Sequence, residues 1–293
     1  MEPCIVSDSV SSFRYRGKTY LPGALVELPD NFPIHLYPFL KSYEYNHDER
    51  IRKYQRPKPI TIKPLLAVMS VRRIPKVLKA FEKLDFLDKV YFRNFTPAVV
   101  SSQINKFIDN HLSTYTHIIV TSDDITPSPE NIKQLISDVA NYDFPVIAGY
   151  CNQCEFNRQD QHGCICGNCV DNKPHRTTNV TIDPVNTVTL SRNSYKFLPM
   201  EWTVQHQGIF RVWFQGMACG VVSIETHKQV PFRSWNKGNG GLMQDLALAF
   251  DLHEHDISQF VDFRVGIRHY GTHHGQLLVG KEPSRIDFEA KKT

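Results

Sequence analysis

Apolar residues in the middle of the chain follow two alternating patterns. Short apolar runs are typical of buried strands, and apolar residues three and four positions apart are typical of amphipathic helices. The expected strands cover 60–70, 89–95, 117–120 and 144–149, and the expected helices between them cover 75–84, 99–112 and 129–140. Strands that alternate with helices predict a parallel sheet with helices on both faces, which is an α/β fold.

The chain on either side of this stretch has a different character. Between Phe13 and Tyr20 aromatic and polar residues alternate around a glycine, which predicts a small β-hairpin or meander. Residues 43–58 are polar and bounded by proline, as in a linker or irregular arm. We therefore divide the chain into an N-terminal β-meander with its linker, 1–58, and a main domain, 59–293.

After Tyr150 the alternation of strands and helices stops. Residues 151–184 form a polar, cysteine-rich insertion. Further strands are expected at 185–190, 209–214, 217–224 and 259–267, with a helix at 242–253.

Composition narrows the class of protein. Of the 293 residues, 41% are apolar and 22% are charged, which is typical of a globular protein with a sizeable core. A net charge of +4 is too small a bias to indicate nucleic acid binding. The sequence has neither an apolar run long enough to cross a bilayer nor a signal peptide, so we expect a cytoplasmic protein, of the cell or of a host.

Candidate binding residues follow the first three strands of the expected sheet. Ligands of open parallel sheets bind beyond the carboxyl ends of the strands. Ser70, Arg72 and Arg73 follow the first strand, Asn94 follows the second, and Ser122–Asp124 follow the third. The planar fork of an arginine can pair with a diphosphate, although two solvated arginines before a helix fit the sequence equally well.

Asp123 and Asp124 come directly after an apolar strand. A pair of carboxylates there is costly unless something neutralises it, and Mg²⁺ or Mn²⁺ prefers oxygen ligands and often bridges a carboxylate to phosphates. The alternative is that Asp124 caps a helix starting near Pro127 while Asp123 is solvated, because aspartate is favoured at helix N-caps.

Three segments together resemble the glycosyltransferases of the GT-A fold, of the inverting type that uses a nucleotide sugar. HIIVTSDDI, from His117 to Ile125, resembles their strand and metal motif. The stretch from Phe214 to Phe232 resembles their acceptor-side strand and the helix after it, and that from Gly240 to Gly271 resembles their Glu-Asp helix and last strand. The resemblance implies a GT-A-like, Rossmann-related α/β fold over about 60–274, apart from the insertion.

The resemblance also implies roles for individual residues. Asp124 and His269 would bind Mn²⁺ or Mg²⁺, with His273 in reserve, and Asp245 would be the general base. The residues expected to contact the nucleotide sugar are Ser70, Arg72, Arg73, Asn94 and Asp123. Two positions depart from the family pattern: Ser122 replaces the first carboxylate of the metal motif, and Gln244 replaces the glutamate beside Asp245.

The implied activity is metal-dependent transfer of a sugar from a nucleoside-diphosphate sugar to a hydroxyl of a glycan, a protein or a lipid. A sugar nucleotidyltransferase is a second hypothesis, although the Gly-rich phosphate loop that it would need is missing from 70–75. A third is a non-catalytic, zinc-stapled binding protein with a GT-A-like fold, which the departures at Ser122 and Gln244 leave open.

The cysteines of the insertion form two Cys-x2-Cys pairs. Cys151 and Cys154 make the first pair, Cys166 and Cys169 the second, and Cys164 is an alternate. This spacing suits a closed tetrahedral zinc site, which would be structural and would staple a segment with few apolar residues. Disulfides remain the alternative.

Overall fold

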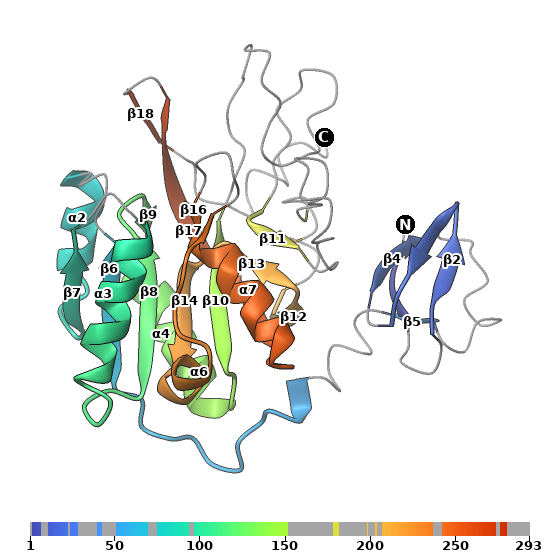
Figure 1. Ribbon diagram of the computed structural model, residues 1–293, viewed down its shortest axis with the longest axis horizontal. Helices are drawn as coiled ribbons and strands as arrows, with labels where there is room; N and C mark the ends of the chain where they lie inside the picture. Colours follow the sequence, from blue (N-terminus) through green and yellow to red (C-terminus); the bar gives the residue numbers. More distant parts are fainter. Residues whose placement is uncertain are drawn as a thin grey trace.

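The structure is a computed structural model (Figure 1). It describes residues 2–6, 11–22, 24–28, 40–42, 51–69, 75–93, 97–151, 178–181, 198, 203, 207–236, 242–273 and 276–279. Much of the cysteine-rich insertion, the strand expected at 185–190 and residues 43–50 of the linker lie outside these residues.

The N-terminal strands form two small antiparallel units. Strand β1 (Glu2–Val6) lies between β4 (Leu25–Leu28) and β5 (Leu40–Ser42), and β2 (Phe13–Tyr15) pairs with β3 (Lys18–Tyr20). Their shared core comprises Cys4, Val6, Phe13, Val26, Leu28 and Leu40. The hairpin turns at Arg16 and Gly17, whose φ angles of 47° and 76° suit the twist of a two-residue hairpin loop. The alternation in the sequence thus predicted the hairpin, whereas β1 and β5 were not expected.

The main domain is built on a mixed sheet. In spatial order its strands are β12 (Ile209–Val212), β17 (Gln259–His273), β10 (Val146–Cys151), β14 (Ala218–Ser223), β8 (His117–Ser122), β6 (Pro64–Met69) and β7 (Asp88–Phe92). Strands β6, β7, β8, β10 and β17 point the same way, and β14 and β12 run against them. The α/β class is therefore confirmed, with a sheet that is mixed.

Strand β14 is the element that the alternation did not place. It lies between β8 and β10 and is antiparallel to both. Its sequence, ACGVVS, is small and apolar, and five of its six positions are buried. Small side chains allow close packing on both faces of a central strand, but they do not indicate its neighbours or its direction.

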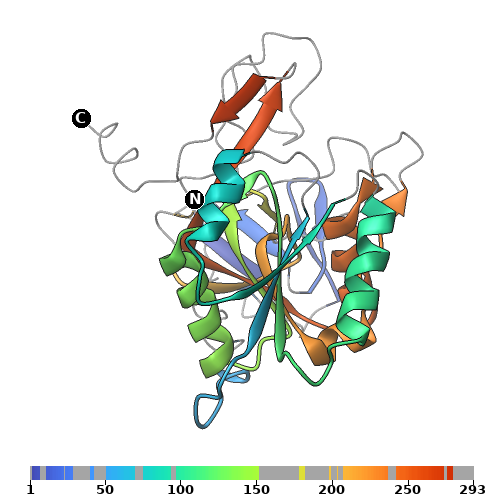
Figure 2. The ribbon, with the colours of Figure 1, turned by 90° about the vertical axis from the view of Figure 1, so that its left-hand side faces the viewer.

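Helices cover both faces of this sheet, as Figure 2 shows edge-on. One face carries α2 (Pro75–Glu82) and α4 (Pro129–Asn141), whose buried residues include Val77, Phe81, Ile132 and Leu135. The opposite face carries α3 (Pro97–Asp109), α6 (Ile224–Gln229) and α7 (Gln244–Glu254), with Ile104, Ile108, Ile224 and Leu248 buried. The four expected helices of the main domain are present within three residues of their predicted bounds.

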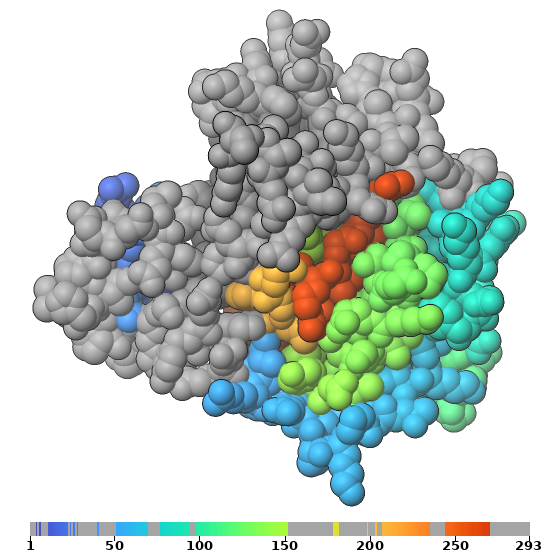
Figure 3. Space-filling model, turned by 180° about the vertical axis from the view of Figure 1, so that it is seen from behind, coloured from blue at the N-terminus to red at the C-terminus, as the bar shows by residue number. Residues whose placement is uncertain are grey.

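Short strands complete the fold around the sheet. Both β9 (Ile125–Thr126) and β18 (Gln276–Val279) pair with β17. Two further pairs join β11 (Val180–Thr181) to β13 (Phe214–Gln215) and β15 (Trp235–Asn236) to β16 (Leu242–Met243). Figure 3 shows β17, in red, running beside α4 on one face of the molecule. Within the described ranges, no helix has the length and apolar character needed to cross a bilayer.

Candidate active site

Asp123 and Asp124 lie at the carboxyl end of β8, where the sheet was expected to bind a ligand. Strand β8 pairs in register with β6, so that Ser122 lies opposite Met69. The backbone N–H of Asp123 continues this pairing by donating to the carbonyl of Met69 at 3.1 Å. The side chain of Asp123 is fully buried and Asp124 is 5% exposed, so neither carboxylate is an ordinary solvated surface group.

The alternative role of Asp124 as a helix cap is wrong. Helix α4 begins at Pro129 and is capped by Ser128, whose hydroxyl accepts a hydrogen bond from the N–H of Asn131 at 3.2 Å. The side chain of Asn131 accepts in return from the N–H of Ser128 at 3.0 Å, which completes a capping box. Asp124 is therefore not needed to begin the helix.

Strand β17 brings a histidine to Asp124 because it extends beyond its neighbour. It pairs with β10 up to Ile267, opposite Cys151, where β10 ends. Its next residues, Arg268 and His269, pair instead with β9, which directly follows the two aspartates. As a result, Nε2 of His269 lies 3.4 Å from Oδ2 of Asp124. The other oxygen, Oδ1, accepts a hydrogen bond from the hydroxyl of Ser122.

The pair of Asp124 and His269 has donor atoms that fit a divalent cation. Two ligands about 2.1 Å from an octahedral ion, at right angles to each other, lie about 3 Å apart, close to the observed separation. A carboxylate and an imidazole both bind Mn²⁺, whose remaining positions are commonly filled by water and substrate phosphates. Among the residues that the structure describes there is no group of three or more His, Cys, Asp and Glu side chains able to hold a metal. Asp124 and His269 would thus supply part of a coordination shell, with the substrate completing it.

Asp245, the expected base, lies in the first turn of α7. Its Oδ1 accepts a hydrogen bond from the N–H of Leu246 at 2.8 Å. Burial raises the pKa of Asp245 to about 6, while the hydrogen bonds from the backbone N–H groups of Leu246 and Asp245 itself act in the opposite direction. A carboxylate with such a pKa is ionised near neutral pH yet more basic than an exposed aspartate, which suits a general base.

The carboxylates of Asp124 and Asp245 both influence the thiol of Cys151. Burial is the largest cause that raises its pKa, and the charges of Asp124 and Asp245, with that of Cys219, raise it further. Both carboxylates therefore act on the same point, the buried end of β10, although one follows β8 and the other begins α7. At neutral pH the thiol is protonated, since the pKa of an ordinary cysteine already lies above 8.

The remaining predicted residues are not all placed by the structure. Ser70, Arg72, Arg73 and Asn94, expected to contact the nucleotide, lie outside the described residues, as do Cys154, Cys164, Cys166 and Cys169. Cys151 is buried in the core of the sheet, and His273 ends β17 opposite Gln276. The zinc site and the nucleotide contacts therefore stay predictions.

The two departures from the family pattern have contacts of their own. The hydroxyl of Ser122 donates a hydrogen bond to one oxygen of Asp124, as described above. Gln244 donates through Nε2 to the hydroxyl of Ser101 at 2.6 Å, which ties the start of α7 to α3. At the position where the resemblance implied a glutamate, this chain thus has an amide that fixes the position of the helix carrying Asp245.

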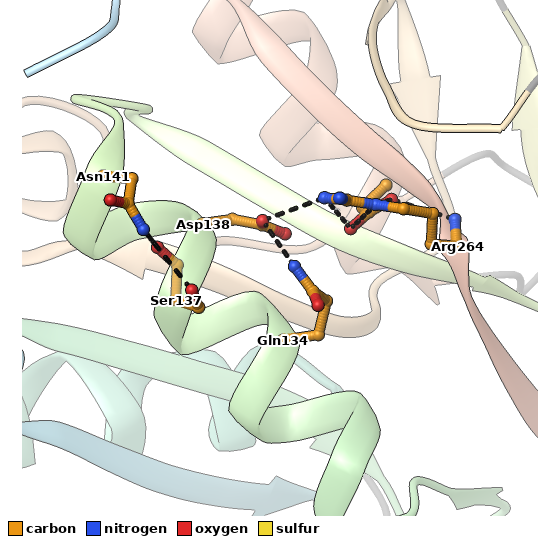
Figure 4. A network of polar contacts seen from close by, with 6 residues as sticks. Gln134, Ser137, Asp138, Asn141 and Arg264 are labelled. Carbon is orange, nitrogen blue, oxygen red and sulfur yellow. Dashed lines mark hydrogen bonds and ion pairs between the residues drawn. The ribbon is translucent and has the colours of Figure 1, made fainter.

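A second carboxylate cluster was missed by the sequence analysis (Figure 4). Asp138 on α4 is 4% exposed and accepts hydrogen bonds from Gln134 at 2.9 Å and from Arg264 at 3.1 Å. Arg264 also binds the buried Asp262 at 2.8 Å. Burial, then the charge of Asp262, raise the pKa of Asp138 to about 8. One signal was available: Asp138 falls on the buried face of α4, three residues after Leu135.

Comparisons with known proteins add little to this geometry. No family model matches the chain, and no curated protein matches it. Among solved structures, the crystal structure of A197 from STIV is similar with a TM-score of 0.44 and 11% sequence identity, over 75% of this chain and 95% of that one. A likeness at this level bears on neither family nor activity.

Proposed function

We propose that this protein is a glycosyltransferase that moves a sugar from a nucleoside-diphosphate sugar to the hydroxyl of an acceptor. The observation that carries the proposal is the 3.4 Å approach of His269 to Asp124 at the carboxyl ends of the sheet strands. These residues are distant in sequence and are the two for which the resemblance implied a shared metal ion. A bound Mn²⁺ or Mg²⁺ would offset the negative charge that develops on the departing diphosphate.

Asp245 supplies the base that an inverting transfer needs. Its carboxylate takes the proton of the acceptor hydroxyl as that oxygen attacks the anomeric carbon and the bond from this carbon to the diphosphate oxygen breaks. The raised pKa of about 6 makes the carboxylate a better proton acceptor than an exposed aspartate. The charges of Asp245 and Asp124 both raise the pKa of the Cys151 thiol, which supports their action on the same substrate.

The test is a sugar-transfer and hydrolysis assay with a panel of uridine, guanosine and thymidine diphosphate sugars in the presence of Mn²⁺. We expect activity with at least one donor and its loss on chelation. Asp124→Asn should weaken Mn²⁺ binding by more than about 100-fold, because even groups that only orient a metal ligand contribute 10- to 100-fold. Asp85→Asn, in an exposed turn, is the matched control and should bind Mn²⁺ like the parent.

A failure would be plain to see. If neither a nucleoside diphosphate nor Mn²⁺ bound the parent protein, as measured by calorimetry, and no donor in the panel turned over, the proposal would be overturned.

A non-catalytic binding protein is the second candidate, favoured by the hydrogen bond from Gln244 to Ser101. In that contact, the residue at the position of the expected glutamate fixes helix α7. Such a protein would bind a nucleotide sugar without turnover, and Asp245→Asn would leave the affinity for it unchanged. Turnover that depends on Asp245 excludes this candidate.

A further inference from the structure

A hollow lies at one edge of the central sheet. Strand β7 is the last strand of this sheet in the described part of the chain, and its single recorded strand partner is β6 (Figure 1). An open cavity of about 400 Å³ runs between this edge and α3. Its lining residues are Val90, Tyr91, Phe92, Arg93, Gln103, Lys106, Phe107 and Asn110.

The wall on the α3 side is one continuous stripe of the helix. Its members, Gln103, Lys106, Phe107 and Asn110, follow the spacing that places residues on a single helical face. The neighbouring stripe, which includes Ile104 and Ile108, is buried against the sheet. The hollow therefore has a fixed wall: α3 is held to the sheet by one stripe and presents the next one beside β7.

The floor and rim of the hollow combine apolar surface with positive charge. The ring of Phe107 meets that of Phe92 edge to face at 6.0 Å and stacks on His111 at 4.1 Å. Arg93 and Lys106 are exposed, and the lining includes no Asp or Glu. Within the described part of the chain, neither cation is in an ion pair. The surface thus offers two positive charges beside an aromatic ring.

The edge of β7 adds hydrogen-bonding capacity. An edge strand has N–H and C=O groups on its outer side that a further strand can bind. Peptides that extend a sheet in this way gain affinity from the main chain and specificity from alternate side chains that enter pockets. Here the side chains of such a peptide that face the hollow would meet Arg93, Lys106 and the ring of Phe107.

We propose that this hollow binds an extended acidic segment of a partner protein, which adds to the sheet beside β7. Two acidic side chains of the segment pair with Arg93 and Lys106, and an apolar side chain between them covers Phe107. The charge argues against a second copy of this chain as the occupant, because pairing two such edges would bring the positive charges of both hollows together. The proposal does not depend on the glycosyltransferase assignment.

The probe is a fluorescein-labelled peptide with the core Glu-Thr-Leu-Thr-Glu, in which every second side chain faces one side of a strand. Its anisotropy is measured with the full-length protein at low salt. Two comparison peptides carry lysine in place of glutamate or N-methyl groups on alternate backbone nitrogens. We expect the acidic peptide to bind, the lysine peptide not to bind, and the N-methylated peptide to bind at least tenfold more weakly.

Variants of the protein test the rim. Arg93→Glu and Lys106→Glu should each weaken binding of the acidic peptide by between about 2-fold and 30-fold, since reversing a charge at a solvated rim loses one attraction and adds one repulsion. Lys58→Glu, an exposed reversal outside the hollow, is the matched control. Hydrogen exchange should show the peptide protecting the amides of β7.

Three outcomes would overturn the proposal. The first is no binding of the acidic peptide to a protein whose circular dichroism shows it folded. The second is equal binding of the N-methylated peptide, which would mean that the peptide binds by charge alone and does not add to the sheet. The third is self-association in sedimentation that Arg93→Glu strengthens, which would make a second copy the occupant of this edge.

Discussion

Strand β17 carries two carboxylate sites of different character, one near each end. Near its start, Asp262 and the facing Asp138 are held by Arg264, whose guanidinium is always charged. Near its far end, Asp124 lies close to the imidazole of His269, which can lose its proton and bind a metal. The first arrangement places a permanent cation beside two buried carboxyl groups, and the second can exchange a proton for a metal cation.

The location of each cluster fits this difference. Asp138 and Asp262 lie where α4 packs on the sheet, and both carboxylates are at most 4% exposed. Asp124 and His269 lie at the carboxyl ends of the strands, and the side chain of His269 is 26% exposed. Burial of charge is therefore not by itself a sign of function: what distinguishes the two sites is a titratable, metal-binding partner at the edge where ligands of such sheets bind.

The largest effect is expected for Asp245 in the candidate active site. Asp245→Asn should lower kcat by about 10²- to 10⁴-fold, the usual contribution of a general base, with little effect on the free energy of unfolding. In the parent, kcat/KM should fall as pH drops below the pKa of about 6. The measurement is a pH–rate profile of both proteins.

Glu254→Gln, at the exposed end of the same helix, provides the control and should keep the profile of the parent. If Asp245→Asn retained the parental rate, the carboxylate would not be the base.

The second effect concerns the buried cluster. Arg264→Met should lower the free energy of unfolding by about 2 kcal/mol, because Asp138 and Asp262 lose their cation. We expect less than the loss for a fully buried pair, since the side chain of Arg264 is 46% exposed and its charge is partly screened by water. Urea denaturation measures the change.

The same variant should bind Mn²⁺ as the parent does, because Arg264 is not part of the site formed by Asp124 and His269. A parallel loss of Mn²⁺ affinity would show that the two ends of β17 are coupled and that the two carboxylate sites do not act separately.

A further effect is a change in how stability depends on pH. The raised pKa of Asp138 means that the folded state holds this proton more tightly than the unfolded chain. The stability it contributes is fully present below the unfolded pKa of 3.8 and is lost as pH rises through about 8. Asp138→Asn keeps a hydrogen-bond donor toward Asp262 and cannot ionise, so its stability should fall less over this range.

The test is a series of urea titrations from pH 5 to pH 9. The two proteins should differ little at pH 5, and the variant should be the more stable at pH 9. Parallel curves for the two proteins would mean that Asp138 is ionised throughout.

The elements between residues 60 and 149 could be predicted because their pattern is local. Helix α4 shows this: Ile132, Leu135 and Val139 recur at helical spacing, and the structure buries all three. The position of β14 could not be predicted in the same way. Nothing in its small apolar residues states that it separates β8 from β10 or runs against them.

The candidate site likewise has features that follow from local sequence and contacts that do not. An apolar run followed by Asp123 and Asp124 is a local pattern, so the sequence alone predicted two carboxylates at the end of a buried strand, and a resemblance supplied Asp245 and His269. The approach of His269 to Asp124 and that of Asp138 to Asp262 follow from the fold. Both contacts depend on where β17 lies and how far it extends, and such pairing between distant segments is set by packing of the whole sheet rather than by any local pattern.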